Sequence, residues 1–240
     1  MVDCAPIAWG LHTISYGRYN LSAKEESSID FKIKNWIVHP EFGIAGGPFI
    51  HSLGILVLKG TPEQFRQVVP AKLGNVSVSK QLFEVSWGDG SWNYSSNAPA
   101  QPSVLLENSV RFVPLSQCRE EYVQLLKSDC SEPYYSRYNV APGYIPGLQS
   151  LRLQYTKVSP WLTPYIPSSY ISRPFCEKDI NESVFCIDES DMPDPGSPII
   201  DERGAVVGIY SFGKFGVPSA VVNLPYYHRW INDVVAKYGI

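Results

Sequence analysis

The chain has 240 residues, a formal net charge of −3 and a pI of about 5.8. This length suits one large domain or two small ones packed together. The chain has no basic surplus to pair with nucleic-acid phosphates, no polybasic run and no apolar stretch long enough to span a bilayer. We therefore expect neither a nucleic-acid partner nor a membrane partner.

The composition and the apolar patterns predict an all-β fold. The chain has 20 Pro, 18 Gly and 13% aromatic residues, which favours many short strands joined by turns. Strand patterns occur, in chain order, at residues 30–42, 53–58, 81–90 and 104–114, and a hairpin is predicted over 197–213 with its turn at 201–204.

Two helices are predicted. Ser116 is the expected N-cap of a short helix that ends at Lys127. An amphipathic C-terminal helix is expected over 225–238, between Pro225 and Gly239. Residues 131–175, which are rich in Pro, Tyr and Ser, carry no pattern that predicts regular structure.

The cysteines and glycosylation sequons bear on the compartment. The five cysteines show no Cys-x-x-Cys or Cys/His spacing typical of zinc, so we expect no metal site and no cofactor. Their odd number leaves at least one thiol unpaired or paired outside this chain. Asn-x-Ser sequons, which favour secretion, occur at Asn20, Asn75, Asn93 and Asn181. Because the opening residues do not form a signal peptide, a secreted protein would have its true N-terminus upstream of Met1.

Short motifs along most of the chain resemble those of trypsin-like (chymotrypsin-fold) serine proteases, in the same order. In chain order they are GRYNL (17–21), VHPEF (38–42), LGILVL (53–58), VSWG (85–88), VPLSQC (113–118), DPGSPII (194–200), GIYSFG (208–213), PSAVVNL (218–224) and YHRWI (227–231). Each motif alone is weak, but their common order is a strong signal.

The resemblance implies two antiparallel β-barrels followed by a C-terminal helix in a single domain. Residues 1–72 would form a partial N-terminal barrel, incomplete at its N-terminus. Residues 73–240 would form the C-terminal barrel, with an insertion at about 131–175 and the terminal helix at 225–238.

All three positions of the catalytic triad are substituted in this alignment. The mechanism needs a nucleophilic hydroxyl, an imidazole that takes its proton and a buried carboxylate that orients the imidazole. Asp3 stands at the histidine position, Ser52 at the aspartate position and Pro195 at the serine position. Proline has neither a hydroxyl nor a backbone N–H, so the nucleophile and one oxyanion donor are lost together.

Further residues take roles from the same resemblance. The remnant of the substrate pocket would comprise Glu189, Ser211, Gly213 and Ser219, with Ser219 narrowing the pocket. His12, His39, His51 and His228 lie outside the triad motif and are expected to be structural or surface residues. His39 would be an ordinary strand-end residue, and His228 would lie on the solvent side of the last helix.

The resemblance also implies how some cysteines pair. Cys118 and Cys186 would form the bridge of the second barrel. Cys130 and Cys176 could then close the 131–175 insertion, although four cysteines allow three pairings that the sequence does not distinguish. Cys4 would bond a cysteine upstream of residue 1, which suggests that this chain lacks the first strands of barrel one.

We therefore predict a secreted, non-catalytic serine protease homologue, without a cofactor, that serves as a binding or regulatory component of a proteolytic cascade. Its partner would be a protein, such as an active protease or the substrate of one. Residues 131–175 are either its binding element or a surface loop. The alternatives are an active trypsin-like endopeptidase and a carbohydrate-binding module on the same scaffold, and the net negative charge disfavours the latter.

Overall fold

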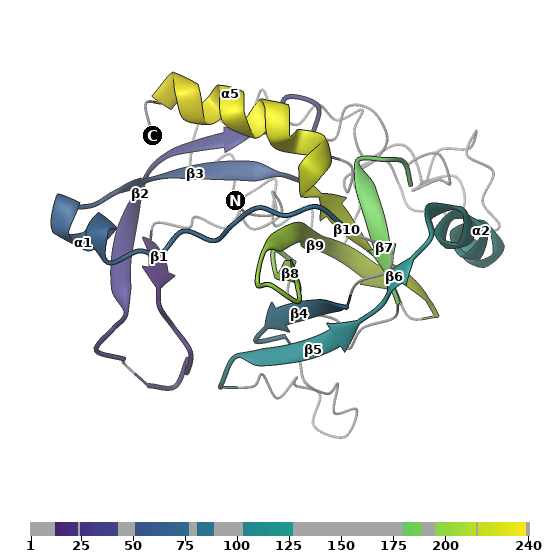
Figure 1. Ribbon diagram of the computed structural model, residues 1–240, viewed down its shortest axis with the longest axis horizontal. Coiled ribbons are helices and arrows are strands. Elements are labelled where there is room, and N and C mark those ends of the chain that lie inside the picture. Colours follow the sequence, from purple (N-terminus) through teal and green to yellow (C-terminus); the bar gives the residue numbers. More distant parts are fainter. Residues whose placement is uncertain are drawn as a thin grey trace, which may run out of the picture.

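The computed structural model describes residues 13–23, 25–42, 51–76, 81–88, 103–126, 180–188, 195–214 and 216–238. These residues form two mostly antiparallel β-sheets, three helices and a short 3₁₀ turn (Figure 1). The prediction of a mainly β fold with a C-terminal helix is confirmed at this level. Among these residues, none of the helices has the length and apolar character needed to cross a membrane.

The first sheet contains three strands in the order β1-β2-β3. These are β1 (Thr13–Tyr16), β2 (Ile29–Val38) and β3 (Gly54–Lys59). The predicted strands at 30–42 and 53–58 are thus present, but β2 stops at Val38, before His39-Pro40. The short helix α1 (Pro62–Arg66) follows β3, and Thr61 is its N-cap. The Thr61 side chain accepts the backbone N–H of Gln64, and the Gln64 side chain accepts the backbone N–H of Thr61.

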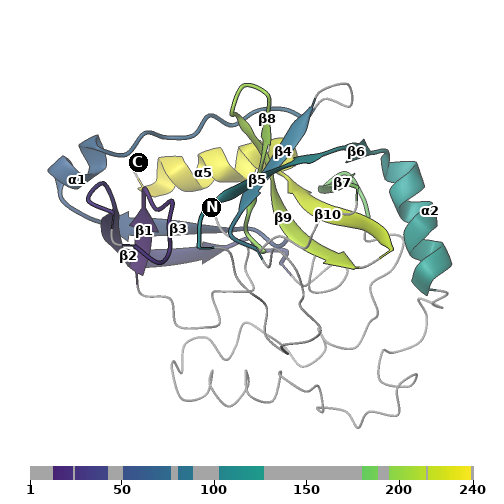
Figure 2. The ribbon, with the colours of Figure 1, turned by 90° about the horizontal axis from the view of Figure 1, so that it is seen from below.

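The second sheet has seven strands among the described residues, in the order β5-β4-β8-β9-β10-β7-β6. Their bounds are β4 (Leu82–Ser86), β5 (Leu106–Val110), β6 (Phe112–Val113), β7 (Val184–Ile187), β8 (Pro198–Asp201), β9 (Val206–Lys214) and β10 (Val217–Asn223). The two outermost strands, β5 and β6, are separated in the chain by Arg111 alone. The sheet must therefore curl until its two edges approach each other (Figures 1 and 2).

Arg111 fixes this corner of the curled sheet. Its backbone N–H and its Nε donate to the two carboxylate oxygens of Asp188, at 2.6 Å and 2.9 Å. The backbone N–H of Asp188 in turn donates to the carbonyl of Arg111 at 2.9 Å. Inside the curl, Leu82, Phe185, Ile199 and other apolar side chains form one buried cluster. The single predicted strand at 104–114 is therefore split in two by a residue that turns the chain.

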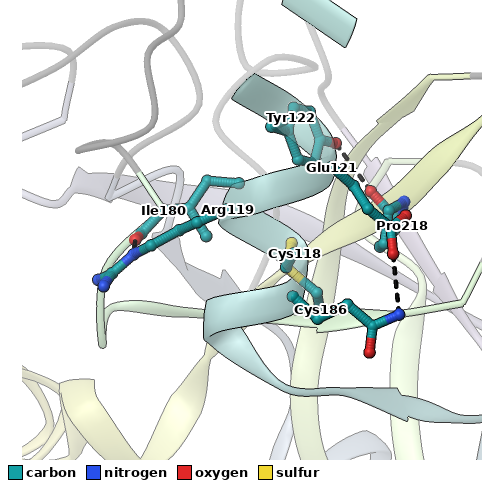
Figure 3. The surroundings of a disulfide bond; sticks show 8 residues. Cys118, Arg119, Glu121, Tyr122, Ile180, Cys186 and Pro218 are labelled. Atoms are coloured by element: carbon teal, nitrogen blue, oxygen red, sulfur yellow. Dashed lines mark hydrogen bonds between the residues drawn. A yellow bond between two sulfur atoms is a disulfide. The ribbon is translucent and has the colours of Figure 1, made fainter. Parts of the chain in front are cut away.

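Helix α2 (Leu115–Leu126) packs outside the sheet and is held there by a disulfide (Figure 3). Cys118 on α2 is bonded to Cys186 on β7, as the resemblance implied. The link joins residues 68 apart, and in the chain-entropy account such a link is worth about 4 kcal/mol. A hydrogen bond also joins α2 to the sheet: the Tyr122 hydroxyl donates to the carbonyl of Pro218 on β10 at 2.8 Å.

The predicted N-cap of α2 is wrong. The helix begins at Leu115, and the carbonyl of Pro114 already accepts the N–H of Cys118 at 2.9 Å. Ser116 therefore lies inside the first turn rather than at its cap. Proline is tolerated at the start of a helix because a backbone N–H there would have no helical partner.

The C-terminal segment spans both sheets. A 3₁₀ turn (Leu224–Tyr227) leads into helix α5 (His228–Tyr238), which corresponds to the predicted helix at 225–238. One buried cluster joins this segment to both sheets: Leu53, Ile55, Ile209, Val222, Leu224, Tyr227, Ile231 and Val234. Figure 1 shows α5 lying across the top of the molecule. His228, expected on the solvent side, is instead half-buried. Its Nε2 is buried and has no hydrogen-bond partner in the part of the chain that the structure describes.

Removal of a large side chain from the buried face of α5 should destabilise the whole fold. We expect Ile231→Ala to lower the free energy of unfolding by about 3 kcal/mol, because it leaves a cavity between the helix and the sheets. Asp233→Ala, on the exposed face of the same helix, should change it by less than about 0.5 kcal/mol. Urea unfolding followed by fluorescence measures the free energy of unfolding of both variants. Equal losses would contradict the burial of Ile231 between the helix and the sheets.

Candidate functional site

Two of the residues that the resemblance assigns to triad positions lie beside different sheets. Pro195 is exposed in the turn before β8, while Ser52 is buried directly before β3. The Pro195 turn is held against β9, because the N–H of Gly196 donates to the carbonyl of Tyr210 at 2.9 Å. The N–H of Tyr210 donates in turn to the carbonyl of Ser197 at 2.8 Å. Asp3 and Glu189 lie outside the described residues.

Three of the proposed pocket residues lie on the neighbouring strands β9 and β10. A Cβ added to Gly213 would lie 2.6 Å from Ser219 Oγ and 2.5 Å from the Tyr210 hydroxyl oxygen. Any side chain at Gly213 would therefore collide with these two hydroxyls. Ser211 is buried, and its hydroxyl has no hydrogen-bond partner among the described residues. Tyr210 thus contacts both parts of the proposed site: its backbone bonds the Pro195 turn, and its hydroxyl lies beside Gly213.

A second cluster, which the sequence did not predict, lies where β2 ends and β3 begins. His39 follows β2 and His51 precedes β3, and the pairing of Val38 with Gly54 brings these two ends together. The N–H of His39 donates to the carbonyl of Leu53 at 2.9 Å. The two imidazole rings stack with their centroids 5.0 Å apart and their planes 12° from parallel. Both histidines are buried.

Aromatic residues of the C-terminal segment enclose these rings. The Tyr227 ring is T-shaped to both imidazoles, with ring centroids 5.1 Å from that of His39 and 5.8 Å from that of His51. The ring centroid of Trp230 lies 4.8 Å from that of His39. The Tyr227 hydroxyl and His51 Nδ1 form a hydrogen bond of 2.8 Å. This bond fixes the orientation of His51, so that its Nε2 faces away from the core.

Glu41 completes the cluster from the solvent side. Its carboxylate Oε2 lies 3.6 Å from His51 Nε2, and its side chain is 62% exposed. Its backbone N–H donates to Nδ1 of His39 at 3.2 Å. We call His39, Glu41 and His51 the histidine–glutamate cluster. It brings one ligand atom from each of two buried imidazoles and one exposed carboxylate within 4.8 Å of one another.

Burial keeps both imidazoles neutral near pH 7. It lowers the pKa of His39 to about 4, with a further lowering by His51 and an opposing effect of Glu41. Burial also lowers the pKa of His51, again against the effect of Glu41. The pKa of Tyr227 is raised by burial, so its phenol is neutral as well. A neutral imidazole has a free lone pair and can accept a proton or bind a metal.

The backbone at His51 is unusual. Its φ is +55°, a left-handed conformation that a residue other than glycine adopts rarely. The Leu53 N–H donates back to the His51 carbonyl at 2.7 Å, which closes a tight turn. Such conformations persist only where the surroundings fix them, and they concentrate at functional sites. Here the turn aims the His51 ring at both Tyr227 and Glu41.

The sequence could have revealed part of this cluster. His39 and His51 are 12 positions apart, which matches no local metal-binding spacing. The available signal was that one histidine ends a predicted strand and the other immediately precedes the next. Two consecutive strands that form an antiparallel pair bring such positions together. The contribution of Tyr227 depends on the packing of the C-terminal segment, which no local pattern shows.

The sequons differ in their surroundings. Asn75 is exposed. Asn20 and Asn181 are half-buried, and the side-chain oxygen of each accepts the backbone N–H two residues later, from Ser22 and Ser183, at 2.9 Å in both cases. Of the described sequons, Asn75 therefore offers the most accessible amide. Asn93 lies outside the described residues, as do Cys4, Cys130, Cys176, His12 and the segment 131–175.

No protein-family model matches this chain, and no curated protein matches it significantly. Its function is therefore inferred from its own residues and their geometry.

The hydrogen bond between Tyr227 and His51 should contribute measurably to stability. We expect Tyr227→Phe to lower the free energy of unfolding by about 1–2 kcal/mol, since it leaves a buried imidazole nitrogen without its partner. Tyr226→Phe is the matched control, because Tyr226 is 52% exposed and its loss should cost less than about 0.5 kcal/mol. Urea titration of both variants tests this, and the hydrogen bond is unimportant if the two behave alike.

Proposed function

We propose that the chain is a non-catalytic homologue of trypsin-like serine proteases, and that it acts as a secreted binding or regulatory component of a proteolytic cascade. It would fold as two β-barrels of that family, the first incomplete, and would bind a protein partner such as an active protease or its substrate. The role in a cascade is taken from the family resemblance.

The observation that carries the proposal is Pro195. By resemblance this residue stands where the family has its nucleophile, and in the structure it lies exposed in a turn that is tied to β9 through Gly196. An exposed turn of this kind would present a serine hydroxyl to a substrate. Proline presents no hydroxyl and no N–H, so acyl transfer and the stabilisation of an oxyanion by this residue are both impossible.

The rest of the structure is compatible with this interpretation. Ser52, at the proposed position of the orienting acid, is buried just before β3 of the first sheet, whereas Pro195 precedes β8 of the second. An active site shared between two sheets would need both. Serine carries no charge to stabilise an imidazolium. The Cys118–Cys186 disulfide supports an oxidising compartment such as the extracellular space.

Labelling with a fluorophosphonate probe tests the absence of a nucleophile. We expect no label on the purified full chain under conditions that label an active trypsin-like protease completely. The neighbouring hydroxyl of Ser197 provides the matched variant. Labelling that disappears on heating and in Ser197→Ala would show that a shifted nucleophile operates and that the chain is an active endopeptidase.

A binding role is tested separately, with the segment 131–175 as the proposed recognition element. We expect the full chain to change the rate at which an active trypsin-like protease cleaves a protein substrate, through contact with the enzyme or the substrate. A variant in which a short Gly-Ser linker replaces 131–175 should lose this effect. The shortened variant must retain the circular dichroism of the full chain. If it regulates cleavage as well as the full chain does, the segment is not the recognition element.

A further inference from the structure

The histidine–glutamate cluster has the composition of a transition-metal site. His39, Glu41 and His51 each offer one ligand atom, and the three atoms lie within 4.8 Å of one another. Imidazole nitrogen and carboxylate oxygen are common protein ligands of zinc, and two histidines with one glutamate form a known type of three-ligand site. We propose that these three residues bind one divalent transition-metal ion of the zinc type. The proposal is independent of the protease-like function.

Metal binding requires the three ligand atoms, which lie within 4.8 Å of one another, to move closer together. The stacked rings of His39 and His51 must also rotate, because the lone pair of an imidazole nitrogen lies in the plane of its ring. In a tetrahedral zinc site, bonds of about 2.0–2.1 Å place neighbouring ligand atoms roughly 3.4 Å apart. His51 Nε2 and Glu41 Oε2 are already 3.6 Å apart. The Glu41 side chain is mostly exposed, so it can adjust without disturbing the core. The backbone of His39, which is held at the end of β2, is the fixed side toward which the carboxylate moves.

The protonation of the rings favours metal binding. The His39 ring accepts the Glu41 N–H on Nδ1, which therefore carries a lone pair on the side of Glu41. A metal ion can take up this lone pair in place of one long hydrogen bond. On His51, Nδ1 is engaged by Tyr227, which leaves Nε2 to face the carboxylate. When Nε2 binds the ion, Nδ1–H donates to the neutral Tyr227 hydroxyl.

Tyr227 is thus the positioning residue of this site. Metal-bound histidines commonly donate their second ring N–H to an oxygen, which fixes the orientation of the ring and raises its affinity for the ion. The left-handed backbone at His51 serves the same geometry, because it turns the ring toward both Tyr227 and Glu41. The Tyr227–His51 bond and the φ of His51 are two independent observations that support the ligand set.

The site differs from a closed structural zinc centre. Three protein ligands leave one tetrahedral position open, and Glu41 approaches from the exposed side. Water or a donor group of a bound molecule can occupy that position. The ion would also link the ends of β2 and β3 to the C-terminal segment, through the bond between His51 and Tyr227. Because it binds the native state, it would stabilise that state.

The test is metal binding to the purified full chain after removal of any affinity tag and dialysis against a chelator. Zinc is titrated calorimetrically, and cobalt by its visible absorption. We expect one ion per chain. Glu41→Gln should weaken zinc binding by about 100-fold or more, and Tyr227→Phe by about tenfold. Glu63→Gln, which alters another exposed glutamate, and His228→Asn, which alters a histidine outside the cluster, should bind as the wild type does.

Several results would overturn the proposal. One is a zinc affinity of Glu41→Gln that equals the affinity of Glu63→Gln. A second is zinc binding that His51→Asn retains. A third is a set of sulfur-to-cobalt charge-transfer bands, which would reveal cysteine ligands. Failure of the wild-type chain to bind zinc more tightly than Glu41→Gln would overturn it as well. If His51→Asn does not fold, Glu41→Gln still decides, because the exposed carboxylate makes no contribution to the core. Near-ultraviolet circular dichroism establishes that each variant is folded.

Discussion

The packing of the C-terminal segment against both sheets is the interaction on which the rest of the molecule depends. Ile55 of the first sheet, Val222 of the second and Ile231 of α5 belong to one buried cluster, so neither sheet completes its core alone. Tyr227 lies in this cluster, and its hydroxyl reaches His51. The hydrophobic burial that joins the sheets thereby also positions a polar group, and the geometry of the histidine–glutamate cluster follows from the core.

The second sheet depends on a separate constraint, the return of its last strand to its first. Because only Arg111 separates β5 from β6, the curl is imposed by chain connectivity and is fixed by the bonds to Asp188. The disulfide then anchors α2 outside the curl. The Pro195 turn lies on β9 near the middle of this sheet, so its position is set by strands that are paired on both sides.

Much of the fold could be predicted from the sequence, because its strands carry local signals. Alternating or continuous apolar residues located β2, β3, β4 and the β8–β9 hairpin, and the amphipathic pattern located the C-terminal helix. The errors came from tertiary context. Ser116 satisfied the composition of a cap, but Pro114 already supplied the first helical carbonyl. His228 was assigned to the solvent side by its spacing, yet the fold buries its Nε2. His39 and His51 meet only through strand pairing, which no local pattern describes.

The two proposals meet at the segment that leads into β3. In the proposed alignment, Ser52 would stand at the position where the protease family holds its orienting acid. His51, the residue before it, has a left-handed backbone, and its Nε2 faces Glu41. An enzyme of that family would use this segment to present a carboxylate to an imidazole. Here the same segment presents an imidazole to a carboxylate, outside the triad motif. In the proposed non-catalytic homologue, no proton relay through position 52 would have to be preserved, so a left-handed turn beside it would carry no catalytic cost.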